Sequence, residues 1–163
     1  MAFAYSVRFF RVLHRRTLYY PHMQTLAVQF LDQGFHRVLF NAMPMPVFVV
    51  DQDVSILEYN TAAAGLLGNK KNGLLRRRAG DVLHCLNARE TPAGCGHSSH
   101  CCQCVVRQAV GAAFRGRAVT RKAGEVQWSG KAKRKKLSLR VSAQPINYDQ
   151  QKFVLLVLEG LND

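Results

Sequence analysis

The apolar residues of the chain change their spacing at Pro44 and Pro46. Before the prolines they recur every three or four residues, which predicts an amphipathic helix over residues 25–42. After them they gather in short runs rich in β-branched and aromatic residues, which predicts strands. Proline ends a helix because it has no N–H to donate and disfavours helical geometry at the preceding residue. The change of period predicts an α+β fold.

The segment after the prolines predicts five strands and three further helical segments. The strand candidates are residues 47–50, 56–59, 118–128, 136–146 and 152–159, and the helix candidates are residues 62–67, 81–86 and 103–114. The first two strands are joined by a polar turn and form a predicted hairpin. Asn60 and Thr61 are suited to cap the helix that follows them, and Gly124 is expected to interrupt the third strand. The pattern predicts an antiparallel sheet with the helices on one face.

Charge and hydropathy limit the class of protein. The 163 residues carry 23 Lys and Arg against 10 Asp and Glu, a formal net charge of +13. No apolar run approaches the roughly 18–20 residues that a membrane-spanning helix needs. Arginines interrupt the apolar residues of the first 20 positions, which disfavours a secretory signal and indicates a cytoplasmic protein. We therefore predict a basic extension over 1–24, the helix over 25–42, and one folded domain over 43–163.

All five cysteines lie within residues 85–104. With Cys102 left out, their spacing is C-x9-C-x5-C-x2-C. Two thiols separated by two residues can turn toward one metal, and a returning loop can supply two more ligands. The spacing predicts a metal site, and its ligands are Cys85, Cys95, Cys101 and Cys104. Zinc and an iron–sulfur cluster both suit four thiolates, so the spacing leaves the cofactor open.

Two other interpretations of the same cysteines stay open. The pairs Cys101/Cys102 and Cys101/Cys104 are close enough in sequence to form a reversible disulfide, which would make the loop a redox switch. Alternatively, the cysteines are small buried apolar residues, although a polar loop rich in Gly, Ser and His is a poor place to build a core. His84, His97 and His100 are expected to be polar surface residues.

Two stretches of the chain resemble the PAS domain family. Residues 41–63 are similar to its opening, in which a strand ends in an acidic turn and a second strand runs into an Asn that begins a short helix. Residues 153–163 are similar to its last strand and acidic exit, and the cysteine segment resembles a cysteine-bearing subgroup found in bacterial signalling proteins. The resemblance implies a module for sensing or dimerisation that is coupled to an output partner, which we expect to act in trans. The cysteines suggest that the signal is redox state or a metal. The apolar face of the helix over 25–42 needs burial, which suggests a homodimer.

The basic residues suggest a second function. One cluster comprises Lys70, Lys71 and residues 76–78, and another comprises Lys131, Lys133 and residues 134–136. Such clusters attract phosphates, so the alternative is an adaptor that binds nucleic acid, an anionic surface or a protein and has only structural cysteines. Few aromatic residues accompany these clusters, which disfavours binding of single strands. No phosphate-binding loop or nucleophile motif is present, so we expect a protein that is not an enzyme.

Overall fold

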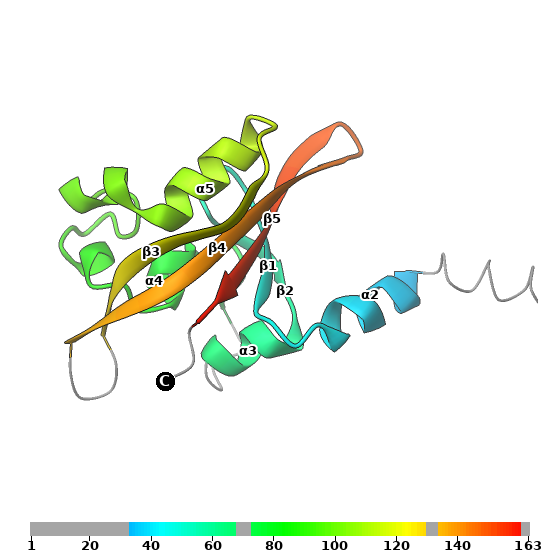
Figure 1. Cartoon of the computed structure of the whole chain (residues 1–163), viewed down its shortest axis with the longest axis horizontal. Coiled ribbons are helices and arrows are strands. Elements are labelled where there is room, and N and C mark those ends of the chain that lie inside the picture. The colour runs from blue at the N-terminus through cyan, green and yellow to red at the C-terminus, as the bar shows by residue number, and fades with distance from the viewer. Residues whose placement is uncertain (1–32, 68–72, 130–133, 161–163) are drawn as a thin grey trace, which may run out of the picture. The chain divides into compact units, whose positions relative to one another are not determined.

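The structure, a computed structural model, describes residues 33–67, 73–129 and 134–160, and its described strands form one antiparallel sheet (Figure 1). The strands are β1 (Val47–Val50), β2 (Ile56–Tyr59), β3 (Val119–Ser129), β4 (Arg134–Tyr148) and β5 (Gln151–Glu159). Their order across the sheet is β2-β1-β5-β4-β3. The last strand of the chain therefore lies between the first strand and β4. The predicted α+β fold with a five-stranded antiparallel sheet is confirmed.

After residue 42, the described part of the domain contains four short helices and one longer helix. They are α3 (Thr61–Leu67), α4 (Ala79–Val82), the 3-10 helices η1 (Asn87–Arg89) and η2 (Ser99–Gln103), and the longer α5 (Val105–Phe114). Helix α5 packs against β3, β4 and β5 (Figure 1). Helix α2 (Gln33–Ala42) precedes the sheet, and the chain divides within it into two units, residues 1–39 and 40–163. The sheet belongs to the second unit.

The buried core lies between α5 and one face of the sheet. Along β5 the burial alternates, because successive side chains of a strand point to opposite faces. The residues of β4 and β5 that share one core cluster with α5 are Leu139, Val141, Ala143, Val154, Leu156 and Leu158. On α5 the buried positions Val106, Ala109, Val110 and Ala113 follow helical spacing. The small alanines let the helix axis approach the sheet closely.

Asn60 joins the hairpin of β1 and β2 to helix α3. Its side chain is 1% exposed. Its Oδ1 accepts hydrogen bonds from the N–H of Val47 at 3.0 Å and from the N–H of Ala63 at 2.9 Å. Its Nδ2 donates to the carbonyls of Met43 at 3.2 Å and Met45 at 2.9 Å. The predicted cap of α3 is confirmed, and the same amide also fastens the chain entering β1.

Several predicted element boundaries are wrong by a few residues. Helix α5 begins at Val105 rather than 103, because Cys104 is extended (ψ 119) and acts as its N-cap. Helix α4 begins at Ala79 and ends at Val82, earlier than the predicted 81–86. Gly124 does not interrupt β3, whose pairing runs through Gly124 opposite Leu139; the irregularity lies between Val119 and Lys122. The predicted extension over 1–24 and residues 25–32 of the predicted helix lie outside the described residues.

The glycine in β3 has a packing reason. A Cβ at Gly124 would lie 2.6 Å from the Cβ and Cγ1 atoms of Val105, the first residue of α5. Any larger residue would push the start of the helix away from the strand. Glycine here marks a close approach of two elements, which a strand interior permits without a break.

Candidate functional site

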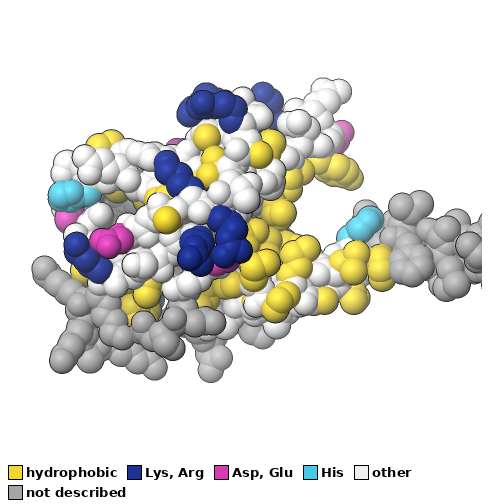
Figure 2. All heavy atoms as spheres, viewed as in Figure 1, with side chains coloured by type: hydrophobic (Ala, Val, Ile, Leu, Met, Phe, Trp, Pro, Cys, Tyr) yellow, Lys and Arg dark blue, Asp and Glu magenta, His cyan; other side chains and the backbone are white. Residues whose placement is uncertain are grey.

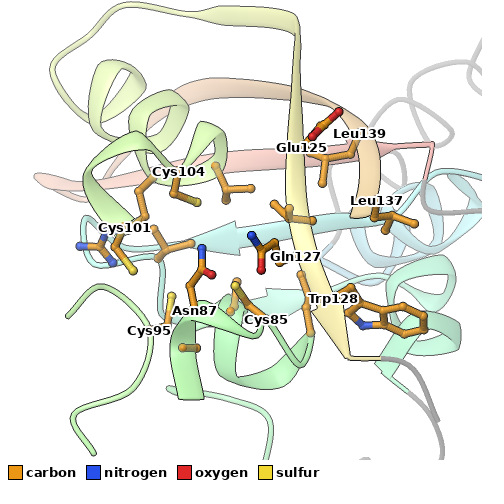
Figure 3. A pocket seen from close by; sticks show the side chains of 18 of the residues that line it. Cys85, Asn87, Cys95, Cys101, Cys104, Glu125, Gln127, Trp128, Leu137 and Leu139 are labelled. Carbon is orange, nitrogen blue, oxygen red and sulfur yellow. The ribbon is translucent and has the colours of Figure 1, made fainter. Parts of the chain in front are cut away.

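A pocket of about 540 Å³ lies between the start of α5, strand β3 and the segment that joins α4 to α5 (Figure 3). Four cysteines line it, and their sulfurs surround the same space. They are Cys85, Cys95, Cys101 and Cys104. Apolar side chains form much of the remaining wall, including Leu83, Val126, Leu137, Leu139 and Leu158. The fold thus brings all four predicted site residues to one cavity.

Cys85 is held by an exchange of backbone hydrogen bonds with the end of β3. It forms an isolated antiparallel bridge with Trp128. The Leu86 N–H donates to the Gln127 carbonyl at 2.9 Å, and the Ser129 N–H donates to the His84 carbonyl at 3.0 Å. The segment after α4 is therefore fastened to the sheet on both sides of Cys85. Trp128, the chain's single tryptophan, lines the same pocket.

Cys95 is held against helix α4. Its N–H donates to Oδ1 of Asp81 at 2.8 Å. A Cβ at Gly80 would lie 2.6 Å from the Cys95 Sγ and 3.5 Å from the Cys85 Cβ. Gly94 has φ +77, and a Cβ there would lie 2.8 Å from Asp81 Oδ1. Two glycines therefore let the Cys95 loop close on α4, which places Cys95 next to Cys85.

Cys101 and Cys104 lie at the two ends of the turn that leads into α5. Cys101 belongs to η2 and is 9% exposed, and Cys104 is the N-cap of α5. Ser98 caps η2: its Oγ accepts from the His100 N–H at 3.2 Å and donates to the carboxylate of Glu90. This hydrogen bond ties η2 to the residue after η1.

Cys102 lies apart from the other four thiols. It is exposed, does not line the pocket, and its Sγ donates to the Ser99 carbonyl at 3.1 Å. The sequence analysis also excluded Cys102 from the predicted ligands. The five cysteines all fall in the described part of the chain, and each carries a free thiol.

Burial raises the pKa of the Cys85 and Cys95 thiols above its ordinary value. At Cys85, hydrogen bonds from the backbone of Ala88 and Asn87 lower the pKa, and the neighbouring Cys104 and Cys101 thiols raise it again. At Cys95 a hydrogen bond from the backbone of Gly80 lowers the pKa. Desolvation is the largest effect at both, and it favours the protonated form of these thiols. A buried neutral thiol is a weak nucleophile.

Arg107 is a pocket residue that the sequence analysis did not identify. It lies on α5, in the turn after Cys104, and lines the cavity. Its Nη2 is 3.6 Å from Asp53 Oδ1, and its Nη1 donates to the Asp53 carbonyl at 3.3 Å. Gly96, with φ +99, leaves room for this guanidinium, since a Cβ there would lie 2.6 Å from Nη1. Arg107 thus connects the pocket to the turn between β1 and β2.

The four cysteines predicted to bind a metal line one cavity, but they are not grouped around a single ion. Across residues 33–67, 73–129 and 134–160, no three His, Cys, Asp or Glu side chains are grouped so as to hold a metal ion. The four cysteines share the cavity without converging on one point. Their role as metal ligands therefore stays a prediction. His84, His97 and His100 are exposed, as expected, although His100 also touches the pocket rim.

Comparison with known proteins identifies the fold. Residues 34–97 match the family model of the PAS domain. The fold is similar to the PAS domain of nitrogen regulation protein NR(II) from Vibrio parahaemolyticus, at 15% identity and TM-score 0.55, over 77% of this chain and 97% of that one. The domain has the fold of PAS domains, and the predicted resemblance to that family is confirmed. A second PAS domain, of an HTR-like protein from Haloarcula marismortui, is 17% identical with TM-score 0.48, over 85% of this chain and 99% of that one. No curated protein matches the sequence.

The basic residues that the structure describes lie in separate groups. Figure 2 shows Lys and Arg side chains in several patches on one face rather than in one continuous band. The segment 76–78 lies beside strand β2. The Arg76 N–H donates to the Ile56 carbonyl at 2.6 Å, and the Ile56 N–H donates to the Arg77 carbonyl at 2.9 Å. Lys70, Lys71, Lys131 and Lys133 lie outside the described residues. In the described helices we find none that is long and apolar enough to cross a bilayer.

Asp51 has a structural explanation in the hairpin of the PAS domain. Its Oδ1 accepts hydrogen bonds from the N–H of Asp53 at 2.9 Å and of Ser55 at 2.8 Å. A carboxylate that accepts bonds from the next residues along the chain stabilises a turn. Asp51 therefore stabilises the turn between β1 and β2.

Proposed function

We propose that this PAS domain is a sensory module of signal transduction whose input site is the cysteine-lined pocket. One observation carries the proposal: four of the five cysteines, spread over 20 residues of loop, face one cavity of about 540 Å³. Thiols so arranged can respond to a bound metal or cluster, or to oxidation. We further propose that the domain acts on an output partner in trans and does so as a homodimer.

Helix α5 is the element suited to carry the signal from the pocket. Cys104 is its N-cap, and Arg107 lies in its first turn. The helix packs on three strands of the sheet. A change at the Cys104 thiol therefore acts on the first turn of a rigid element whose far side is buried against β4 and β5. A shift of α5 changes the packing of the sheet, which is how a local chemical event reaches a distant surface.

Hydrogen exchange of the full-length chain tests the proposal. The protein is purified without oxygen, and its metals, sulfide and visible absorption are measured. Exchange of the α5 amides is then compared before and after treatment with a chelator, and separately with peroxide. We expect one of the two treatments to raise exchange in α5.

Cys102→Ser is the matched control, because Cys102 is on the same loop but outside the pocket. Cys101→Ser and Cys104→Ser are expected to change the content of bound cofactor or the exchange response, while Cys102→Ser behaves as the wild type. Equal cofactor content and equal exchange responses in all three variants and the wild type would overturn the proposal. That result would favour the alternative function, an adaptor with structural cysteines. The affinity of such an adaptor for a polyanion should fall steeply as the salt concentration rises.

A further inference from the structure

We infer that the pocket holds a [4Fe–4S] cluster, ligated by Cys85, Cys95, Cys101 and Cys104. This inference deepens the proposed function and rests on it, because it names the cofactor of the same site. It selects one of the two cofactors that the cysteine spacing leaves open. Cavity size, the distribution of the sulfurs, hydrogen bonds to them, and nearby charge support it.

The size of the cavity favours a cluster over a single ion. A zinc ion sits about 2.3 Å from each of four thiolate sulfurs and needs no cavity beyond the space between them. A [4Fe–4S] core is a body of eight atoms, and its four thiolates attach at separate corners. The four cysteines here enter a cavity of about 540 Å³ from the turn after α4, the Cys95 loop, η2 and the start of α5. Figure 3 shows their sulfurs distributed around that space.

Backbone groups supply the hydrogen bonds that cluster sulfurs accept. The backbone of Asn87 and Ala88, at the start of η1, donates hydrogen bonds to the Cys85 sulfur. The backbone of Gly80 donates to the Cys95 sulfur. Such hydrogen bonds stabilise thiolate ligands and set the potential of an iron–sulfur cluster. The close approach of Gly80 to Cys95 is available only because residue 80 has no side chain.

The charge around the pocket suits an anionic group. A cluster with four thiolate ligands carries net negative charge. Cys104 caps the ten-residue helix α5, whose N-terminal end carries partial positive charge. The Arg107 guanidinium lines the pocket in the first turn of the same helix. Arg107 pairs with Asp53, which does not line the pocket, and the acidic residue of the lining, Glu125, forms an ion pair with Lys136 at 3.5 Å. Among the described residues, the lining therefore presents no unpaired carboxylate to an anionic group.

The remaining wall protects a cluster from solvent. Val54, Leu83, Val126, Leu139 and Leu158 are apolar residues of the pocket wall. Low solvent access around an iron–sulfur centre slows its loss and tunes its potential. Polar residues also line the pocket, among them His100 and Lys136.

Transfer of a preformed cluster tests the inference without a change of iron oxidation state. The metal-free chain is mixed, without oxygen, with a synthetic [4Fe–4S] cluster that carries four small thiolate ligands. Each of the four protein thiols gives its proton to a released thiolate and takes its place on iron. We expect about four iron and four sulfide per chain, a broad visible absorption that survives desalting, and quenching of Trp128 fluorescence.

Variants and a labelling measurement give separate readouts. Serine at any one of Cys85, Cys95, Cys101 or Cys104 should lower retained iron several-fold, while Cys102→Ser retains as much as the wild type. Alkylation mapped by mass spectrometry in the wild type covers the case in which a serine variant fails to fold. The loaded chain should label at Cys102 as the metal-free chain does, and it should label less than the metal-free chain at the other four cysteines.

The outcomes separate this inference from the proposed function. One outcome is about one zinc per chain, which is lost in the pocket variants but not in Cys102→Ser, with no cluster retained. That outcome would overturn the inference of a cluster but would still support the pocket as the sensory site. Iron retained equally by all variants, or labelling of the pocket cysteines in the loaded chain, shows adventitious binding and also overturns it. If neither iron nor zinc is bound and α5 exchange never responds to chelator or peroxide, both proposals fail.

Discussion

Replacement of Asn60 by alanine should cost the domain about 3–5 kcal/mol of unfolding free energy. The Asn60 side chain is 1% exposed and makes four hydrogen bonds, which is the full capacity of an amide. A net hydrogen bond contributes about 1 kcal/mol, and a buried donor left without a partner costs about 1–3 kcal/mol. Because domains are stable by about 5–15 kcal/mol in total, this single change should bring the fold close to its limit.

Urea unfolding measures this loss. It is followed by Trp128 fluorescence and, independently, by far-ultraviolet circular dichroism. Asn147→Ala is the matched control, because Asn147 is an exposed residue of β4, and it should change the unfolding free energy by less than about 0.5 kcal/mol. A loss below about 1 kcal/mol for Asn60→Ala would falsify the view that this amide joins β1 to α3.

Asn60→Asp separates the donors of the amide from its acceptor. The variant keeps the oxygen that accepts from Val47 and Ala63, but it turns a second carboxylate oxygen toward the carbonyls of Met43 and Met45. We expect a loss of at least about 2 kcal/mol at neutral pH. Acid should restore part of it, since a protonated carboxyl regains one donor. A variant as stable as the wild type at neutral pH would show that the two donor bonds contribute little.

Three further predictions concern other parts of the domain. Gln150→Gly should stabilise the domain by up to about 1 kcal/mol in thermal unfolding. Asp149 and Gln150 both have positive φ in the turn between β4 and β5, and glycine adopts positive φ without the steric clash of a Cβ. A lower melting temperature of the variant would contradict this. Gly124→Ala should destabilise the domain by about 1–3 kcal/mol, because the added Cβ would clash with Val105. Gly65→Ala in helix α3 should be neutral or stabilising, because a Cβ at that position would meet no atom within 4 Å. Equal effects of the two substitutions would refute the packing argument. Burial raises the pKa of Cys85 and Cys95, so the folded metal-free chain keeps these protons to higher pH than the unfolded chain does. The resulting stabilisation is complete below the ordinary thiol pKa and is lost as the pH rises above it. The slope of unfolding free energy against alkaline pH should be smaller in a Cys85→Ala/Cys95→Ala double variant than in Cys102→Ala, and unchanged slopes would count against the desolvation of these thiols.

Local chemistry determined the elements of this protein. Proline, polar turns and the change from helical to alternating spacing act within a few residues, so the strands, the cap at Asn60 and the order of elements follow from the sequence. The errors are also local. Helix α5 begins after Cys104, and β3 runs through Gly124, because packing of Val105 on that glycine outweighs the poor strand propensity of glycine.

The cysteine spacing identified which residues belong to the candidate site, but only the tertiary structure decided what surrounds them. Cys85 lies next to Trp128 and Cys95 lies against Gly80, while Arg107 reaches Asp53. These contacts join residues 15 to 54 positions apart in the chain. Hydrophobic periodicity has a range of a few residues and carries no information about such pairings. The cavity, with its size, its apolar wall and its backbone donors, exists only once α5 has packed on the sheet.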